Sequence, residues 1–316
     1  MRNPGSLAKR TSCPRDTRSA SRPRLSPAWL AVLAGLPLAA QAVSAQAASD
    51  KDSHLGVPSV AACSERYPLV ASPTPALGLQ SADEAIREGF STTRTWGTED
   101  NVELLGGGAS RSTALRVGYP EGTSSPGDTE VGGAGFYSAP EGFSGRDHAC
   151  LRYTVRFEDG FDFVKGGKLP GLYGGEAPSG GDKVTGENGF SLRYMWRENG
   201  QGELYEYVAD SRESNDDSDY GDSVGRGLFS FPTGQWVTLE QEVILNDPGQ
   251  ENGVVRVWVD GRPVLEQQGM VYRTSDDVTI DGLMFSTFFG GHGKDWRTPH
   301  DQHADFADFR FYAPSS

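Results

Sequence analysis

Short runs that alternate apolar and polar residues dominate the second half of the sequence and predict β-strands. They are LRYTVRF (151–157), WVTLEQEVIL (236–245), VVRVWVDGRPV (254–264), GLMFSTFFGG (282–291) and DFADFRFY (305–312). Asp260-Gly261 in the third run is typical of a hairpin turn, and only Ser81–Phe90 has a convincing helical pattern. With 41 glycines, the chain is expected to be all-β, an antiparallel β-sandwich of the jelly-roll type. A concave sheet face in such a fold would offer a groove for an extended polymer.

The N-terminus has the pattern of a secretory signal. Seven basic residues precede an apolar run at 28–40, and small residues follow it. This order predicts cleavage near Ala45 or Ala47, since the run is too short to span a bilayer comfortably. The expected segments are a signal peptide (1–45), a disordered lead-in (46–62) and one jelly-roll domain (63–316). The mature protein is expected to be secreted or periplasmic.

The chain is strongly acidic. Its net charge is −14, and loss of residues 1–45, with seven basic side chains and one acidic, lowers the charge to −20. A charge of this sign argues against a nucleic-acid or anionic-membrane partner. A polyanionic substrate would still bind if a cleft gathered basic side chains locally.

The cysteines predict one disulfide. Cys13 leaves with the signal, and Cys63 and Cys150 remain. An even number of cysteines in an oxidising compartment is expected to pair. The long loop closed by this bond corresponds to a stabilisation of ~4–5 kcal/mol in the chain-entropy model. Two buried free thiols are the alternative.

The stretch FSLRYMWRENGQGELYEYV (190–208) predicts a hairpin with one polar face. Because side chains alternate along a strand, one face collects Ser191, Arg193, Met195, Arg197, Tyr205 and Tyr207. The other face would pack the core through Leu192, Tyr194, Trp196, Leu204 and Val208. A loop centred near Gly200 would put Arg193 opposite Tyr207, and Met195 opposite Tyr205. The alternative is a solvated sheet face whose tyrosines pair across the strands.

A second stretch, KGGKLPGLYGGEAPSGGDK (165–183), adds basic residues. Gly166-Gly167 and Pro170-Gly171 are expected to fix a tight backbone path that presents Lys168. The densest cationic group of the mature chain would then contain Lys165, Lys168, Lys183, Arg193 and Arg197. Solvated loop lysines are the alternative.

These residue types suit β-elimination in a 4-linked uronic-acid polymer. The C5 proton becomes acidic only when a cation, here Lys168 or Arg193, neutralises the neighbouring carboxylate and the developing enolate. A tyrosine beside cations is expected to act as the base, because positive charge lowers its pKa from ~10. In mannuronate and glucuronate the C5 hydrogen and O4 lie on one side of the ring, so one tyrosine could be base and then acid. Ser191 would hold a hydroxyl or carboxylate oxygen.

The assembled motifs resemble polysaccharide lyase family 14, the alginate and glucuronan lyases with a β-jelly-roll fold. They are GGKLPGLYGG, GFSLRYMWR, GELYEYV, VRVWVDG and FSTFFGGHGKDW, within residues 100–312. The family has a lysine in K-L-P-G, an S-x-R pair and a Y-x-Y pair. The resemblance implies that the catalytic groove is formed by Lys168, Ser191, Arg193, Tyr205 and Tyr207. Alginate and glucuronan both remain open as substrates.

Further residues are expected to bind substrate along the groove. They are Lys165, Tyr173, Arg197, His292, Lys294 and Trp296. Trp296 would stack on a sugar, and His292 or His300 could be an auxiliary base. The histidines lack a metal-ligand spacing such as H-E-x-x-H, and the acidic loop 210–223 lacks the EF-hand order. We therefore expect no metal and no cofactor.

Two other functions were weighed against the lyase. A retaining β-glucanase needs two carboxylates ~5–5.5 Å apart, but the sequence has no E-x-D-x-x-E strand. A noncatalytic carbohydrate-binding module needs aromatic platforms, and a lysine beside tyrosines would serve no purpose there. We therefore favour a lyase that acts as a monomer on an anionic polysaccharide, with neither nucleic acid nor membrane as a partner.

Overall fold

The structure is a computed structural model that describes residues 55–92, 94–106, 113–127, 131–209, 220–291 and 293–315. The predicted signal peptide, His292 and residues 210–219 of the acidic loop lie outside this part of the chain. The helical elements are α1 (Cys63–Arg66), α2 (Ala82–Gly89), η2 (Glu198–Gly200) and η3 (Lys294–Trp296). None of the helices in the described ranges has the length and apolar character needed to cross a membrane.

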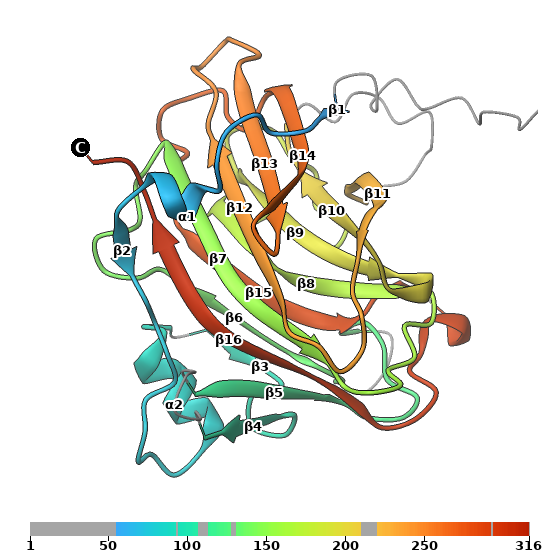
Figure 1. Cartoon of the computed structure of the whole chain (residues 1–316). Helices are drawn as coiled ribbons and strands as arrows, with labels where there is room; N and C mark the ends of the chain where they lie inside the picture. The colour runs from blue at the N-terminus through green and yellow to red at the C-terminus, as the bar shows by residue number, and fades with distance from the viewer. Residues whose placement is uncertain are drawn as a thin grey trace, which may run out of the picture. The chain divides into compact units, whose positions relative to one another are not determined.

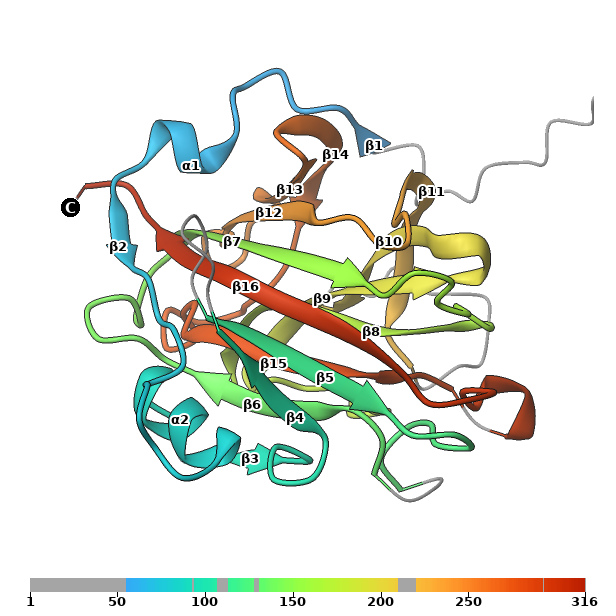
Figure 2. The same cartoon turned by 60° about the horizontal axis from the view of Figure 1, so that its bottom comes forward.

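Two antiparallel sheets make up the domain (Figure 1). Sheet A has the order β1 (Leu55–Gly56), β14 (Arg262–Met270), β13 (Gly253–Val259), β12 (Val237–Ile244), β7 (His148–Phe157), β16 (Gln302–Tyr312), β5 (Ala114–Tyr119) and β4 (Val102–Leu105), with β2 (Leu69–Ala71) also paired to β16. Sheet B has the order β11 (Asp222–Ser230), β10 (Gln201–Tyr207), β9 (Gly189–Arg197), β8 (Gly166–Gly175), β15 (Gly282–Phe289), β6 (Ala134–Ser138) and β3 (Thr95–Trp96). The predicted all-β jelly-roll sandwich is confirmed. In Figure 2, β16 and β5 of sheet A lie over β15 and β6 of sheet B.

The core lies between the two sheets and follows the predicted alternation. Leu192, Tyr194 and Trp196 of β9 are fully buried on the face of sheet B that packs against sheet A. The Tyr194 hydroxyl donates a hydrogen bond of 3.0 Å to the Glu240 carbonyl on β12. Burying the apolar parts of such residues is the main stabilising contribution to the sandwich. The opposite face of β9 is thereby turned away from sheet A.

β8 is a central strand of sheet B, and this differs from the expected tight path over residues 165–183. Its ladder with β9 shifts between Leu169 and Leu172, around Pro170-Gly171. Proline cannot donate a backbone hydrogen bond, so the ladder is interrupted here. Gln241 of β12 compensates: its side chain accepts from Leu172 N at 2.8 Å and donates to the Leu192 carbonyl at 3.0 Å. The bulge that follows Lys168 in β8 is therefore anchored by the opposite sheet.

The hairpin β9–β10 has the predicted face but a different register. Arg193 pairs with Tyr205, and Ser191 pairs with Tyr207. The expected pairing, Arg193 with Tyr207, was wrong by two residues. The turn is made by η2, where Asn199 has a φ of 59°. A shift of two residues keeps every side chain on its face, whereas a shift of one would reverse the faces.

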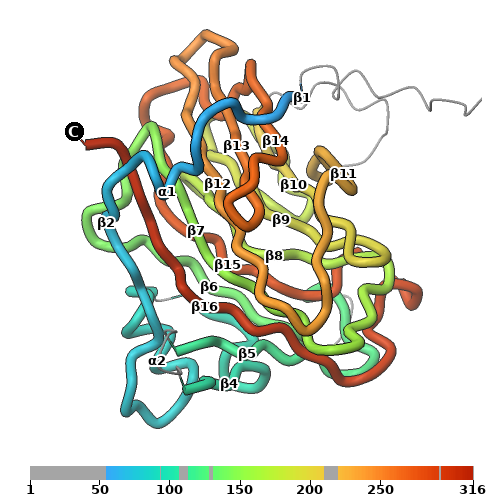
Figure 3. Tube along the Cα trace, viewed as in Figure 1, coloured from blue at the N-terminus to red at the C-terminus, as the bar shows by residue number. Residues whose placement is uncertain are grey.

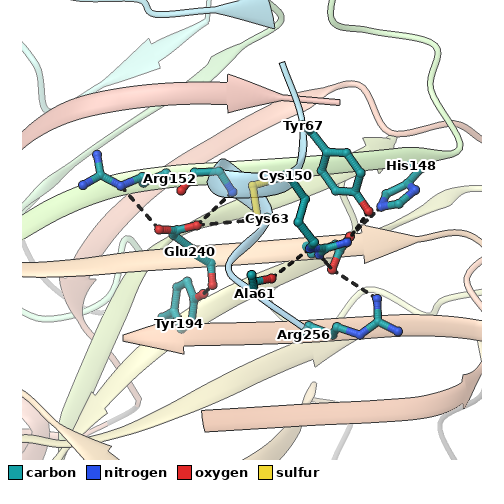
Figure 4. Close-up of a disulfide and its surroundings, with 12 residues drawn as sticks. Ala61, Cys63, Tyr67, His148, Cys150, Arg152, Tyr194, Glu240 and Arg256 are labelled. Carbon is teal, nitrogen blue, oxygen red and sulfur yellow. Dashed lines mark hydrogen bonds and ion pairs between the residues drawn. A yellow bond between two sulfur atoms is a disulfide. The ribbon is translucent and has the colours of Figure 1, made fainter. Parts of the chain in front are cut away.

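The N-terminal part of the domain is tied to sheet A. Cys63 of α1 and Cys150 of β7 form the predicted disulfide, with 6.0 Å between their Cα atoms (Figure 4). β1 pairs with β14 inside the segment expected to be a disordered lead-in, so regular structure begins there before Cys63. The predicted helix near 81–90 is α2, and the Ser81 side chain caps it by accepting a hydrogen bond from Glu84 N at 3.1 Å.

Candidate active site

A cavity of about 430 Å³ lies on the face of sheet B that points away from the core. Its lining crosses the sheet from β10 to β3, and it includes Lys168, Arg193, Met195, Arg197, Tyr205, Tyr207, Phe288, Met284, Tyr137 and Trp96. The Cα trace in Figure 3 shows β8, β9 and β10 as neighbouring strands. They place Lys168, Arg193, Arg197 and the two tyrosines at one end of the cavity, whereas Lys165 and Lys183 of the predicted cationic group lie outside its lining. Its long axis therefore runs across the strands.

Lys168 lies at the floor of the cationic end and is only 9% exposed. Its Nζ atom is 2.8 Å from Met195 Sδ and 3.7 Å from the centre of the Tyr205 ring. Burial, and then the charges of Arg193 and Arg197, hold the pKa of Lys168 well below its usual value. The amine is thereby biased toward its neutral form, which can accept a proton.

Arg193 is a buried cation without an acidic partner. It is 3% exposed, and its guanidinium lies 5.9 Å from the Tyr205 ring centre and 6.0 Å from that of Tyr207. In the described residues no carboxylate lies within ion-pair distance of it, and its Nε atom has no hydrogen-bond partner. Burial lowers its pKa. Because an uncompensated buried charge is costly, this end of the cavity is suited to an anionic ligand.

Tyr205 and Tyr207 stand side by side, with their rings 5.8 Å apart in an edge-to-face arrangement. Burial raises the pKa of Tyr205, and its interaction with Tyr207 adds to this; the opposing effect of Arg193 is smaller. The expectation that nearby cations lower this tyrosine's pKa is therefore wrong for Tyr205 in the unliganded protein. The Tyr207 hydroxyl accepts a hydrogen bond of 3.1 Å from Gly181 N. Tyr205 is thus a protonated phenol, suited to donating a proton.

Ser191 does not line the cavity. Its hydroxyl is fully buried and donates a hydrogen bond of 2.6 Å to the Pro178 carbonyl. The same loop contributes Ser179 and Gly180 to the lining. Ser191 therefore positions a wall of the cavity, whereas the sequence predicted a direct contact with substrate.

Comparisons with known proteins agree with this geometry. The family model described as "Polysaccharide lyase 14" matches residues 108–309. The chain belongs to polysaccharide lyase family 14. The structure is similar to that of a family 14 alginate lyase from Aplysia kurodai, at 35% identity and a TM-score of 0.67, over 78% of this chain and 100% of that one. The predicted family is thereby confirmed, and the protein is a polysaccharide lyase.

Two more distant solved structures share the fold. An alginate lyase from a Chlorella virus is 21% identical with a TM-score of 0.61, over 78% of this chain and 100% of that one. An endo-β-1,4-glucuronan lyase from the fungus Trichoderma reesei is 13% identical with a TM-score of 0.51, over 78% and 96%. A comparison with curated protein sequences gives no match.

In this family 14 lyase, Arg197 is not a free cation. Its guanidinium pairs with Glu203 at 2.6 Å, and Arg226 of β11 pairs with the same carboxylate at 2.6 Å. Glu203 is fully buried. The sequence reasoning missed Glu203, although alternation along β10 places it on the face of Tyr205 and Tyr207. The pairing leaves Arg193 as the uncompensated arginine of β9.

The other predicted contacts lie at the rim of the lyase cavity or beyond it. Trp296 lines the cavity, and Lys165 pairs with Asp295 at 3.1 Å while its Nζ lies 5.9 Å from the Trp296 ring centre. Lys294 is exposed and outside the lining. Tyr173 packs 5.3 Å from the Tyr137 ring beside the cavity, and burial, reinforced by Asp281, raises its pKa to about 12. His292 lies outside the described residues.

The far end of the cavity was not predicted. Trp96, Tyr137, Met284, Ser286 and Phe288 line it from β3, β6 and β15. The Trp96 indole lies over Gly135, where a Cβ atom would be 2.3 Å from the ring. Only the order of strands in sheet B brings these residues together. The aromatic run at 282–291 predicts a strand, which is β15, but nothing in the run predicts that its side chains line a cavity.

Proposed function

We propose that this lyase cleaves a 4-linked uronic-acid polymer, alginate rich in mannuronate or glucuronan, by β-elimination. The observation that carries the proposal is Arg193, a buried guanidinium without an acid, beside a lysine and a tyrosine whose pKa values are shifted in opposite directions. The uronate carboxylate is the anion that such a site would accept. The 35% identity to an alginate lyase supports this substrate class.

The reaction breaks the C5–H and C4–O4 bonds of one sugar and forms a C4=C5 double bond. Arg193 pairs with the carboxylate at C5, and its charge stabilises the enolate that develops as the C5 proton leaves. A base takes that proton, and an acid gives a proton to the departing O4. The products are one chain with an unsaturated uronic acid at its non-reducing end and one with a new reducing end.

The shifts in pKa suggest which side chain does each step. Lys168, biased toward the neutral amine, accepts the C5 proton, and Tyr205, held as a phenol, donates to O4. Lys168 Nζ lies 3.7 Å from the Tyr205 ring centre, so both can reach one sugar ring. This assignment replaces the expectation of a tyrosine base. A single tyrosine that serves as base and acid is the alternative, and the pH profile distinguishes the two.

Ultraviolet absorbance of the unsaturated product tests the proposal. The mature protein is incubated with polymannuronate, polyguluronate, mixed alginate and glucuronan, each with and without a chelator. A rise on at least one polymer that survives the chelator supports elimination by side chains alone. New reducing ends without absorbance would mean hydrolysis, and binding without either would mean a carbohydrate-binding module.

Substitution at Lys168 tests the residue assignment. We expect Lys168→Met to lose activity by about 10²-fold or more, as is common for a general base. The control is an unchanged thermal unfolding transition or a higher one, because a buried amine is removed. Full activity in the folded variant would refute the role of Lys168.

We further propose that the protein is exported after cleavage near Ala45 or Ala47. The Cys63–Cys150 disulfide supports this, because such bonds persist mainly in oxidising compartments. N-terminal sequencing of protein recovered outside the cytoplasm tests it. A chain that starts at Met1 would contradict the proposal.

A further inference from the structure

A second cation without an acidic partner among the described residues lies beside the aromatic end of the cavity, outside its lining. Arg94 precedes β3, and its guanidinium carbon lies 4.2 Å from the centre of the Tyr137 ring. Trp96 and Phe288 meet edge to face with their ring centres 6.0 Å apart. Tyr137, Trp96 and Phe288 all line the cavity. A guanidinium beside aromatic surfaces is a common way of recognising an acidic sugar, because rings stack on the sugar and the cation meets its carboxylate.

Arg94 is available to a ligand. It is exposed, and across the described ranges no carboxylate lies within ion-pair distance of it. Among the described residues its guanidinium makes one hydrogen bond, a weak one of 3.5 Å from Nη2 to the Tyr137 hydroxyl. By contrast, the cations at the other edges of the cavity are paired, Lys165 with Asp295 and Arg197 with Glu203.

Strand pairing places Tyr137 in line with Arg193. Tyr137 pairs with Met284, and Met284 pairs with Gly171. Gly171 lies against Arg193, since a Cβ atom built on Gly171 would be 2.9 Å from the Arg193 Cα atom. The row from β6 through β15 and β8 to β9 therefore spans three strand spacings, ~14 Å. Tyr137 and Arg193 both line the same cavity.

This separation fits an extended polymer that lies across the strands. A 4-linked uronate chain advances by roughly one sugar per strand spacing, ~5 Å. If Arg193 holds the carboxylate of the sugar that loses its proton, a sugar about three units away lies over Tyr137. Its carboxylate then faces Arg94.

We propose that Arg94, Tyr137 and Trp96 form a distal subsite that binds one uronate residue about three sugars from the residue held by Arg193. This inference rests on the proposed function, because it takes the same polymer as substrate. Arg94 and Trp96 lie before residue 108, where the match to the family model begins. The subsite would make the enzyme prefer long chains over short ones.

The test compares oligouronates from trisaccharide to octasaccharide on the wild type, Arg94→Met and Arg94→Lys. Methionine keeps an apolar cover on Tyr137 without the charge, and lysine keeps the charge. We expect Arg94→Met to lower kcat/KM about 2- to 5-fold for the hexasaccharide and longer chains, as for one exposed ion pair. The trisaccharide, too short to reach both sites, is expected to react as with wild type. Arg94→Lys is expected to restore part of the loss.

Arg310→Met is the matched control. Arg310 is an exposed arginine on β16 of sheet A and does not line the cavity. The same change of charge there is expected to leave the preference for chain length as in wild type. A loss for Arg310→Met equal to that for Arg94→Met would overturn the subsite and indicate a general effect of net charge.

Two further outcomes would overturn the inference. Equal kcat/KM for Arg94→Met and wild type at every chain length would refute the subsite. A loss of kcat/KM that is the same for the trisaccharide as for longer chains would mean that Arg94 only supports Tyr137.

Calorimetric titration with the hexasaccharide separates failure of the subsite from failure of the proposed function. If the wild type binds the hexasaccharide but forms no unsaturated product, the elimination reaction fails, while weaker binding by Arg94→Met still supports the subsite and unchanged binding refutes it.

Discussion

Replacement of Arg193 by methionine should separate stability from activity, because the guanidinium is buried without a counter-charge. The side chain is 3% exposed, and its described neighbours include aromatic rings about 6 Å away and the Lys168 amine, whose pKa is lowered by burial and then by Arg193. Two distant cation–π contacts stabilise it by only ~0.5–1 kcal/mol each. Leaving a charged group buried and poorly hydrogen-bonded costs more, typically several kcal/mol. We therefore expect Arg193→Met to raise the free energy of unfolding by ~1–2 kcal/mol.

The expected change is measurable by thermal unfolding. For a domain of this size, 1 kcal/mol corresponds to roughly 2–4 °C in Tm, so the variant should unfold several degrees above wild type. Activity should fall by ~10²–10³-fold, the usual effect of removing one group that stabilises an oxyanion. Product absorbance on the best polymer gives this number.

Arg197→Met is the matched control, since it lies on the same strand and face. Among the described residues, its removal leaves the fully buried Glu203 with Arg226 as its one ionic partner, so we expect destabilisation by ~2–4 kcal/mol. Opposite signs in the two variants are required. If Arg193→Met unfolds as early as Arg197→Met, the charge of Arg193 is compensated and the argument for an anion site fails.

The remaining predictions concern pH, the disulfide and Ser191. Because Lys168 must be neutral and its pKa is lowered, kcat/KM should rise as pH rises through a value well below 10.5, with Tyr205 still protonated because its pKa is raised; a profile that shows no rise below pH 10 would contradict Lys168 as the base. The double variant Cys63→Ser, Cys150→Ser should lose up to ~4 kcal/mol in urea unfolding, yet keep its activity when folded, since the bond joins α1 to sheet A. Ser191→Ala should raise KM more than it lowers kcat, because the hydroxyl holds the Pro178 loop; a kcat loss alone would indicate direct contact with substrate.

The faces of β9 and β10 could be predicted because a strand has a period of two. The register could not, since the turn at Glu198–Gly200 depends on the left-handed conformation of Asn199. Arg193 therefore faces Tyr205 where Tyr207 was expected. The error left the set of residues unchanged, because a shift of two does not exchange the faces.

Burial explains the larger differences. The sequence shows that Tyr205 lies near cations, but it cannot show that desolvation outweighs their charge and raises its pKa. Likewise, the glycines and proline of 165–183 suggest a tight backbone path, while Gln241 from the other sheet allows a bulged central strand. The aromatic end of the cavity depends on β3, β6 and β15 meeting in sheet B, an arrangement that local patterns do not encode.

The sequence order of sheet B has a consequence for how such an enzyme can diversify. The residues proposed for chemistry all lie on the consecutive strands β8, β9 and β10, whereas the opposite end of the cavity is drawn from β3, β6 and β15. Mutation or exchange of segments in β3 and β6 leaves the ladder of the first group intact, because neither strand pairs with β8, whereas β15 does. The preference for polymer length can thus change between relatives while the proton-transfer geometry stays the same. A library of variants confined to β3 and β6 would test this directly.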